Sequence, residues 1–239
     1  MEINQISIET MGKVFIPNMH KKKRLDNIIN QIQEKFCELN LPEYFYSNLK
    51  FATTEAEILE TMQLRSRAYT KLGYNRQFPE EINGLNYDDF DRNSLILISK
   101  FNEKITGTLR IVYDSIINLP SEKMIELNNL RKKYRLAELS RLIVDPEFRS
   151  GNRENGSMPF NNLFAGTYWT FHLTHLNKYL MVMKNEHAAR YLKFGGIENL
   201  GTTKYENLNQ DSQILLWNPS QISKEFEEKI LGKKIEVAA

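Results

Sequence analysis

The sequence has a single cysteine and no hydrophobic run long enough to cross a membrane. One cysteine, Cys37, excludes an intrachain disulfide framework and is typical of proteins from reducing compartments. No apolar stretch approaches the ~20 residues that a membrane-spanning helix needs, and the first residues lack the cationic-then-apolar pattern of a signal peptide. We therefore expect a cytoplasmic protein without an integral membrane segment.

The sequence also lacks a strong net charge. Lys and Arg number 32 against 30 Asp and Glu, which gives a formal net charge of +2. That excess is too small to indicate nucleic acid as a partner. The sequence shows no internal repeats, low-complexity tracts or clear linker. We therefore expect an N-terminal arm and helix over residues 1–45 and one domain over residues 46–239.

The hydrophobic pattern predicts a mixed α/β fold. Thr54 and Glu57 have the spacing of a capping box, which begins a helix, and Gly73 ends that helix. Helices are expected over residues 25–39, 54–72, 161–178 and 187–194, and strands over residues 46–52, 94–100, 104–113, 137–145, 179–183, 197–207 and 213–217. This order predicts a mixed central sheet flanked by helices.

Arg65 lies on the apolar stripe of the helix over residues 54–72, where a leucine is expected. Either its stem packs while its head reaches water, or the guanidinium is partly buried and needs a carboxylate. Asp88, Asp89 and Asp91 cluster in the polar segment that follows. Their spacing does not match a calcium loop, so they form turns or supply the counter-charge.

The strand over residues 104–113 carries Arg110 inside an apolar run. Alternation places Arg110 on one face and Ile105, Leu109 and Ile111 on the other. Gly107 interrupts the same strand, which predicts a bulge or a close approach of backbones.

The stretch over residues 137–149 is the centre of the predicted sheet. Alternation predicts two faces, one with Glu138, Ser140, Leu142 and Val144, the other with Leu139, Arg141, Ile143 and Asp145. Buried charges cost several kcal/mol unless they are paired, so Glu138 and Arg141 need partners or a chemical role. A structural ion pair at the strand end is the alternative.

The helix over residues 161–178 carries an aromatic stripe. Phe164, Tyr168 and Trp169 either fill the core or line a tunnel for an apolar substrate. His172 and His175 are three residues apart, but no third ligand is evident, so we expect no metal site.

This element order resembles the fold of the GCN5-related N-acetyltransferases (GNAT, acyl-CoA N-acyltransferases). Tyr191-Leu-Lys193-Phe-Gly195-Gly196 is similar to the family motif Tyr-x-Lys-x-Gly-Phe, with Gly196 in place of the aromatic residue. In that family the central strand separates from its neighbour to hold a pantetheine arm. The resemblance implies a cleft there, with the backbone N–H groups of Leu142, Ile143 and Val144 near the thioester carbonyl.

Four further motifs resemble those of the acyl-homoserine-lactone (autoinducer) synthases and the related N-acyl amino acid synthases. They are, in chain order, Arg65 with Tyr69, Asp88 with Asp91, Gly107-Thr-Leu-Arg110 and Glu138-Leu-Ser140-Arg141. The resemblance implies that the aspartates, the arginines and Tyr69 bind the amino substrate, with the α-carboxylate on Arg110 or Arg141. It also implies catalytic roles for Glu138 as the general base, for Ser140, and for Tyr191 as the acid that protonates the leaving thiolate.

Departures from these families bear on the acyl donor. Arg149 is followed by Ser-Gly-Asn-Arg153, which lacks two of the glycines that cradle a pyrophosphate in acetyl-CoA-dependent members. This favours a phosphopantetheine thioester on acyl carrier protein, with acyl-CoA as the alternative donor. Arg149, Arg153 and the basic run over residues 21–24 suit an acidic carrier protein.

Tyr74 and Asn75 stand where the homoserine-lactone synthases have a tryptophan, which favours the amino acid synthase branch. The resemblance thus predicts transfer of a long acyl chain from acyl carrier protein to the α-amine of an amino acid, without a permanently bound cofactor. Phe160, Phe164, Tyr168 and Trp169 are candidates to bury the chain. The alternatives are a homoserine-lactone synthase that uses S-adenosylmethionine, a small-molecule N-acetyltransferase and a non-catalytic acyl-carrier-binding module.

Overall fold

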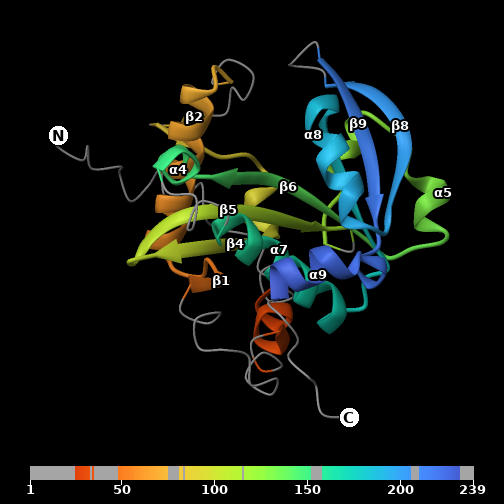
Figure 1. The fold of residues 1–239 in the computed structure, drawn as a ribbon, viewed down its shortest axis with the longest axis horizontal. Coiled ribbons are helices and arrows are strands. Elements are labelled where there is room, and N and C mark those ends of the chain that lie inside the picture. The colour runs from red at the N-terminus through yellow and green to blue at the C-terminus, as the bar shows by residue number, and fades with distance from the viewer. Residues whose placement is uncertain are drawn as a thin grey trace.

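A seven-stranded mixed sheet forms the centre of the molecule (Figure 1). The structure is a computed structural model that describes residues 25–32, 34, 48–74, 81–82, 84–114, 116–151, 158–205 and 210–231. The strand order is β1-β4-β5-β6-β7-β9-β8, and β6 and β7 are the one parallel pair in this sheet. The strands are β1 (Leu49–Phe51), β4 (Ser94–Phe101), β5 (Lys104–Tyr113), β6 (Leu136–Val144), β7 (Lys178–Lys184), β8 (Ile197–Tyr205) and β9 (Gln210–Trp217).

Helices cover both faces of the sheet, as predicted. One face packs against α7, α8, α9 and the helix of residues 25–32, and α7 and α9 lie side by side on it (Figure 1). The other face packs against α4, the hairpin of β2 (Glu81–Ile82) and β3 (Leu85–Asn86), and the segment with η2 and α5. The helices are α4 (Glu55–Lys71), α5 (Asn128–Arg131), α6 (Pro146–Gly151), α7 (Met158–Leu173), α8 (Asn185–Tyr191) and α9 (Lys224–Leu231), with 3-10 turns η1 (Asp91–Asn93), η2 (Pro120–Lys123), η3 (Leu192–Phe194) and η4 (Pro219–Gln221).

Helix α4 begins at the capping box that the sequence predicts. The backbone N–H of Glu57 donates to the Thr54 hydroxyl at 3.3 Å, and the Glu57 carboxylate accepts from the Thr54 N–H in return. Gly73 follows the helix with a φ of 72°, a left-handed conformation that glycine adopts at little cost. Leu72 follows the last residue of the helix and is 48% exposed.

A bulge in β5 changes which residues share a face. Ser99 pairs with Gly107 while Lys100 pairs with Ile105, so Thr106 is an extra residue in the ladder. Ile105 therefore packs on the α4 side, and the prediction that it shares a face with Leu109 was wrong.

Gly107 is also the close approach that the sequence predicts. A Cβ there would lie 3.0 Å from Cβ of Pro159 and 3.1 Å from Cδ1 of Leu163, so glycine lets α7 pack directly on β5.

Helix α7 ends five residues earlier than predicted. The backbone N–H of Asn177 donates to the Arg135 carbonyl, and the Asn177 side-chain oxygen accepts from the Arg135 N–H, both at 2.9 Å. These two bonds draw the chain alongside β6, so Lys178 begins β7 instead of ending the helix.

Strands β6 and β7 separate after four paired residues. Their parallel pairing runs from Leu136 and Lys178 to Leu139 and Met181 and goes no further. On the other edge of β6, Thr108 pairs with Ile143 and Arg110 with Ser140, which leaves Arg141 and Leu142 in a bulge. Arg141 has a φ of 55°, in the left-handed region that non-glycine residues rarely adopt.

This bulge overturns the predicted faces of the central strand. Arg141 lies on the same side of the sheet as Arg110 and Ser140, as the contacts of both arginines with Asp88 show. Leu142 instead joins the core on the α7 side, while Ile143 packs toward α4. The local break in alternation is the physical reason, since an extra residue shifts every later side chain to the other face.

Candidate active site

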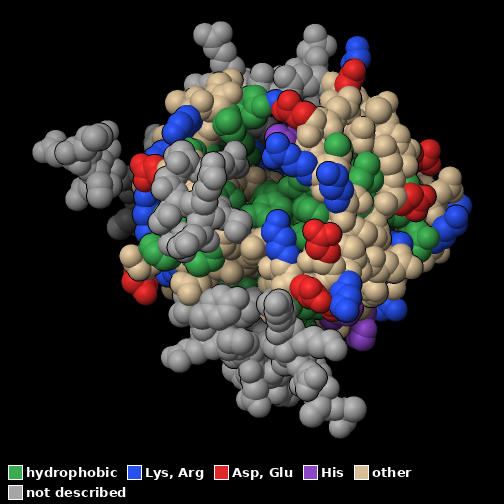
Figure 2. Space-filling view, viewed as in Figure 1, with side chains coloured by type: hydrophobic (Ala, Val, Ile, Leu, Met, Phe, Trp, Pro, Cys, Tyr) green, Lys and Arg blue, Asp and Glu red, His purple; other side chains and the backbone are tan. Residues whose placement is uncertain are grey.

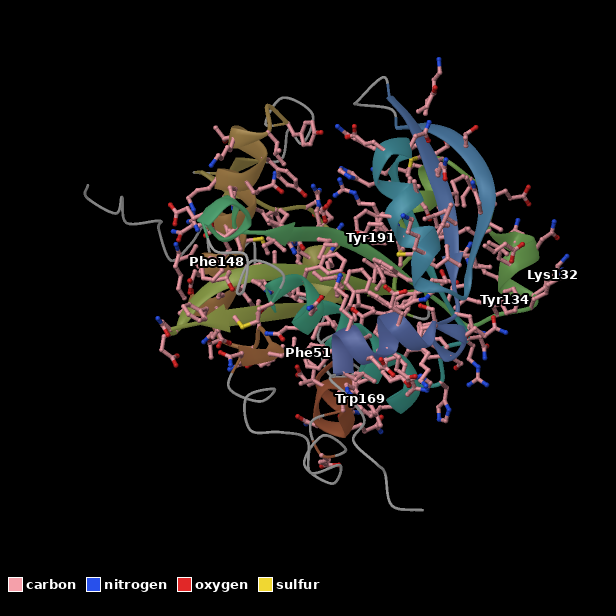
Figure 3. The ribbon with its side chains drawn as sticks, in the orientation of Figure 1. Phe51, Lys132, Tyr134, Phe148, Trp169 and Tyr191 are labelled. Atoms are coloured by element: carbon pink, nitrogen blue, oxygen red, sulfur yellow. The ribbon has the colours of Figure 1, made fainter. Side chains whose placement is uncertain are left out.

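The face that carries α7 and α9 is hollowed near its centre, where Figure 2 shows hydrophobic side chains at the floor and Lys or Arg side chains at the rim. Figure 3 places Tyr191 at the same point of the same view, close to β6. Five partly buried apolar residues that pack on the core come from β6, α7, β7, α8 and η3: Leu142, Phe160, Met183, Tyr191 and Phe194. The separation of β6 from β7 thus opens onto an apolar floor.

On the α4 side of β6 lies a buried network of three arginines and two aspartates. Arg65 Nη1 lies 2.7 Å from Oδ1 of Asp91, and Arg110 Nη1 lies 3.2 Å from the same oxygen. Asp88 accepts from Arg110 through Oδ1, and from Arg141 Nη2 through Oδ2 at 2.6 Å. Arg65 and Arg110 are 0% and 2% exposed, so these charges interact in a medium that screens them weakly.

Further contacts fix the orientation of the network. Arg110 Nε donates to the Ser140 hydroxyl at 2.9 Å, and Arg141 Nη1 donates to the Tyr69 hydroxyl at 3.4 Å. The backbone N–H of Asp88 donates to Oδ2 of Asp91 at 2.9 Å, which locks the loop that carries both carboxylates. Each arginine therefore has a defined geometry, as a site that orients a substrate requires.

Asp88 is held as an anion by the arginines. Burial alone would raise the pKa of Asp88, but the charges of Arg110 and Arg141 outweigh it and hold that pKa well below its usual range. The network sets three arginines against two aspartates.

Glu138 is a buried carboxyl on the strand that supplies Ser140 and Arg141. It is 3% exposed, and its Oε2 accepts a hydrogen bond from the backbone N–H of Ser121 at 2.9 Å. Burial raises the pKa of Glu138 from 4.5 to about 7, against the opposing effects of the Ser121 hydrogen bonds and the Arg110 charge. A carboxyl of this kind exchanges protons near neutral pH.

Most of the substrate and catalytic residues predicted from the sequence lie together. Contacts described above join seven of them: Arg65, Tyr69, Asp88, Asp91, Arg110, Ser140 and Arg141. Glu138 is within electrostatic reach of Arg110 and Asp88. Tyr191 lies on the other side of β6, at the apolar floor.

The predicted acyl-chain residues are only partly brought together. Phe160 and Phe164 stack at 4.5 Å between ring centroids, and Phe164 lies 5.8 Å from the Tyr191 ring. Tyr168 instead contacts Trp169 and His172, and Figure 3 shows Trp169 well away from Tyr191. Val144 is buried at the end of β6. The side chain of Arg149, Arg153 and the basic run over residues 21–24 lie outside the described part of the chain.

Three residues that contact the predicted site residues or their supports were not predicted from the sequence. Ser121 acts through its backbone N–H, which leaves no signal in a sequence. Lys184 at the end of β7 contacts the Tyr74 hydroxyl and lies 4.1 Å from the centre of the Tyr74 ring, which links β7 to the end of α4. Phe194 contacts Phe164 of α7. Its place inside the Tyr191 motif was the available sequence signal.

Within the described ranges, no cluster of three or more His, Cys, Asp or Glu side chains is arranged to hold a metal ion. Among the same residues, none of the helices has the length and apolar character to span a membrane.

We compared the chain with known protein families and proteins. The family model described as N-acyl amino acid synthase FeeM matches residues 60–217. A comparison with curated protein sequences gave no match.

Many solved structures share the fold, and three of them illustrate the low sequence identity. The N-acyl amino acid synthase FeeM from uncultured soil microbes has 16% identity and a TM-score of 0.56, covering 77% of this chain and 94% of that chain. The CoA-dependent acyl-homoserine-lactone synthase BjaI with MTA has 15% identity and a TM-score of 0.57, covering 76% and 85%. The acyl-homoserine-lactone synthase LasI has 13% identity and a TM-score of 0.53, covering 80% and 98%.

These structures establish the mixed α/β fold that the sequence predicts. The family match extends from α4 to the end of β9 and includes the whole charged network, the separation of β6 from β7 and Tyr191. Because the match spans more than half of the chain, the protein belongs to the N-acyl amino acid synthase FeeM family and is an N-acyltransferase.

Proposed function

We propose that the protein transfers an acyl group from a phosphopantetheine-linked thioester to the α-amine of an amino acid. One observation carries this proposal: Glu138, with a pKa of about 7, lies on β6 just before the point where β6 leaves β7. A proton acceptor suited to an ammonium group and an open strand edge suited to a thioester thus lie on one strand.

The amine must be neutral before it attacks. The α-ammonium gives a proton to Glu138, directly or through a water molecule, and the free amine attacks the thioester carbonyl carbon. Backbone N–H groups along Leu142–Val144, beyond the pairing with β7, stabilise the oxyanion that forms. The C–S bond then breaks and the leaving thiolate takes a proton from Tyr191. The nitrogen gives its second proton to water as the amide forms, and exchange with solvent then restores the Tyr191 hydroxyl and the Glu138 carboxylate.

Of the two arginines predicted for the α-carboxylate, Arg141 is the better candidate. Arg110 is 2% exposed and already donates to Asp88 and Ser140. The Arg141 side chain is 11% exposed and lies at the edge of the network, where Nη2 binds Asp88 and Nη1 donates to Tyr69. A guanidinium at this position can add a substrate carboxylate while keeping its contact with Asp88.

For the donor we propose acyl carrier protein carrying a long acyl chain. Helix α6 follows β6 at once, and the sequence after Arg149 lacks the glycines of a pyrophosphate cradle. A donor with a single phosphate needs no such cradle. The related synthase BjaI has been solved with SAM and isopentyl-CoA, so acyl-CoA is the donor against which carrier protein has to be compared.

The test is mass spectrometry of organic extracts from a bacterial culture that overexpresses the protein. We expect N-acyl amino acids that are missing from an empty-vector culture and from a culture expressing Glu138→Gln. Homoserine lactones in their place would contradict the proposed acceptor, and no new acyl amide from soluble folded protein would contradict the reaction. Purified enzyme with matched acyl-carrier-protein and acyl-CoA donors then decides the donor by the ratio of kcat/KM values.

A further inference from the structure

Two glycines let the C-terminal part of the chain dock directly behind the Tyr191 motif. Gly195 and Gly196 have φ values of 82° and 67°. A Cβ on Gly195 would lie 2.5 Å from the Ser223 nitrogen, and one on Gly196 would lie 2.4 Å from the Asn218 carbonyl oxygen. No side chain fits in either place, so the segment leading into α9 occupies the space that an aromatic residue at position 196 would need.

Backbone hydrogen bonds hold this segment in place. The Ser223 N–H donates to the Phe194 carbonyl at 2.7 Å, and the Asn218 N–H donates to the Gly196 carbonyl at 2.8 Å. Helix α9 begins directly afterwards and buries Phe226 and Ile230 in the core. Its position is therefore fixed relative to Phe194.

Aromatic rings connect the apolar floor to α9. Tyr191 lies 5.0 Å from Phe194, and Phe194 stacks face to face on Phe226 at 3.8 Å with an interplanar angle of 3°. Phe160 lies 6.1 Å from Phe194, and Phe164 lies 5.8 Å from Phe226. Tyr191, Phe160 and Phe194 are partly buried, whereas Phe226 is 4% exposed. The rings thus run from the open floor to a closed end.

We infer that α9 is the end wall of the acyl site and that Phe226, through its stacking on Phe194, limits the length of the acyl chain. This inference rests on the proposed function. Protein interiors are close-packed, so a chain that passes Tyr191 and reaches Phe194 finds no space beyond the Phe226 ring. Longer chains are then rejected sterically, while shorter ones leave part of the floor uncovered.

The experiment measures kcat/KM for a ladder of acyl donors of increasing even-numbered chain length with wild type, Phe226→Leu and Phe226→Ala. We expect a sharp fall beyond one length in the wild type. Both variants should move that fall to longer chains, with Phe226→Ala moving it further. Each methylene newly accommodated should improve kcat/KM for the long donors about fourfold relative to wild type.

Ile230→Ala is the matched control, because it also removes buried volume from α9 but has no ring against Phe194. We expect it to keep the wild-type length profile. An equal shift in Ile230→Ala would show a general loosening of α9 and overturn the role of Phe226. An unchanged profile in both Phe226 variants, with a working wild-type enzyme, would overturn the inference alone. A wild type that acylates no amine with any donor would overturn the proposed function first.

Discussion

Nη2 of Arg141 lies 2.6 Å from Oδ2 of Asp88, although regular strand alternation would place the two side chains on opposite sides of the sheet. The left-handed backbone of Arg141 turns its side chain to the Asp88 side. A left-handed non-glycine residue costs of order 1–2 kcal/mol. The ion pair with Asp88 offsets that cost, so the bulge in β6 and the charged network support each other.

Replacing Asp88 should therefore destabilise the protein. Asp88→Asn leaves Arg110 and Arg141 short of a buried counter-charge, and breaking such a pair costs about 3–5 kcal/mol. Asp89→Asn is the matched control, since Asp89 is exposed and its ion pair with Arg92 is long, at 4.0 Å. Urea unfolding at neutral pH should show a large loss for Asp88→Asn and almost none for Asp89→Asn. Equal losses would mean that the network does not stabilise the fold.

Activity should depend on the ionisation of Glu138. Because the pKa of Glu138 is about 7 and a general base must be deprotonated, kcat/KM of the wild type should rise with pH through about 7 and then level off. Glu138→Gln should lose about a hundredfold or more of the rate together with this inflection. A Glu138→Gln enzyme with near-normal turnover at pH 7 would remove Glu138 as the base.

The same carboxyl should make stability fall as pH rises. Between pH 4.5 and about 7, folded Glu138 keeps a proton that the unfolded chain has released. The free energy of unfolding therefore falls as pH rises across this window. The loss amounts to about 3 kcal/mol above pH 7. Glu138→Gln lacks it, so urea unfolding at pH 5 and pH 9 should show a smaller decline for Glu138→Gln than for wild type. Parallel declines would place the pKa of Glu138 near its ordinary value.

Tyr191→Phe tests the proposed proton donor. Removing one hydroxyl keeps the ring contacts with Phe164 and Phe194, so the variant should still fold, which its thermal unfolding transition would show. If Tyr191 protonates the leaving thiolate, kcat should fall by about a hundredfold while KM for the amino acid stays unchanged. A fall of less than about threefold would leave Tyr191 with a packing role.

Gly196→Ala should destabilise the protein more than Gly73→Ala does. Both glycines have a positive φ, but a Cβ at Gly73 meets nothing within 4 Å while one at Gly196 would lie 2.4 Å from the Asn218 carbonyl oxygen. Gly73→Ala therefore reports the backbone cost alone, of order 1–2 kcal/mol. Thermal unfolding of the two variants should differ by at least that amount again, because Gly196→Ala also displaces the segment that leads into α9. Equal effects would mean that this segment yields freely.

Several parts of the site could be predicted from the sequence because they break its pattern. Arg65, Arg110 and Glu138 stand where apolar residues are expected, and burial of a charge requires partners whatever the fold. The structure brings these residues into one region and supplies two aspartates as the counter-charges. The order of strands and helices was also predictable, because the periodicity that identifies each element is a local property of the sequence.

What the sequence did not reveal depends on register and on tertiary contacts. The bulges at Thr106 and Arg141 arise from how neighbouring strands align, so the faces predicted for Ile105 and Arg141 were wrong. The hydrogen bond from Ser121 to Glu138 and the stacking of Phe226 on Phe194 join residues that no local pattern relates.

The pairing of β6 with β7 is the short link between two parts of the sheet. Strands β1, β4, β5 and β6 form one part and β7, β9 and β8 the other, and four residue pairs join them. Under the proposed function, a thioester whose pantetheine amides bind both free edges would take the place of the missing ladder. Donor binding and the mechanical integrity of the sheet are then linked quantities, since a ligand that binds only the assembled edges stabilises the assembly by its own binding free energy.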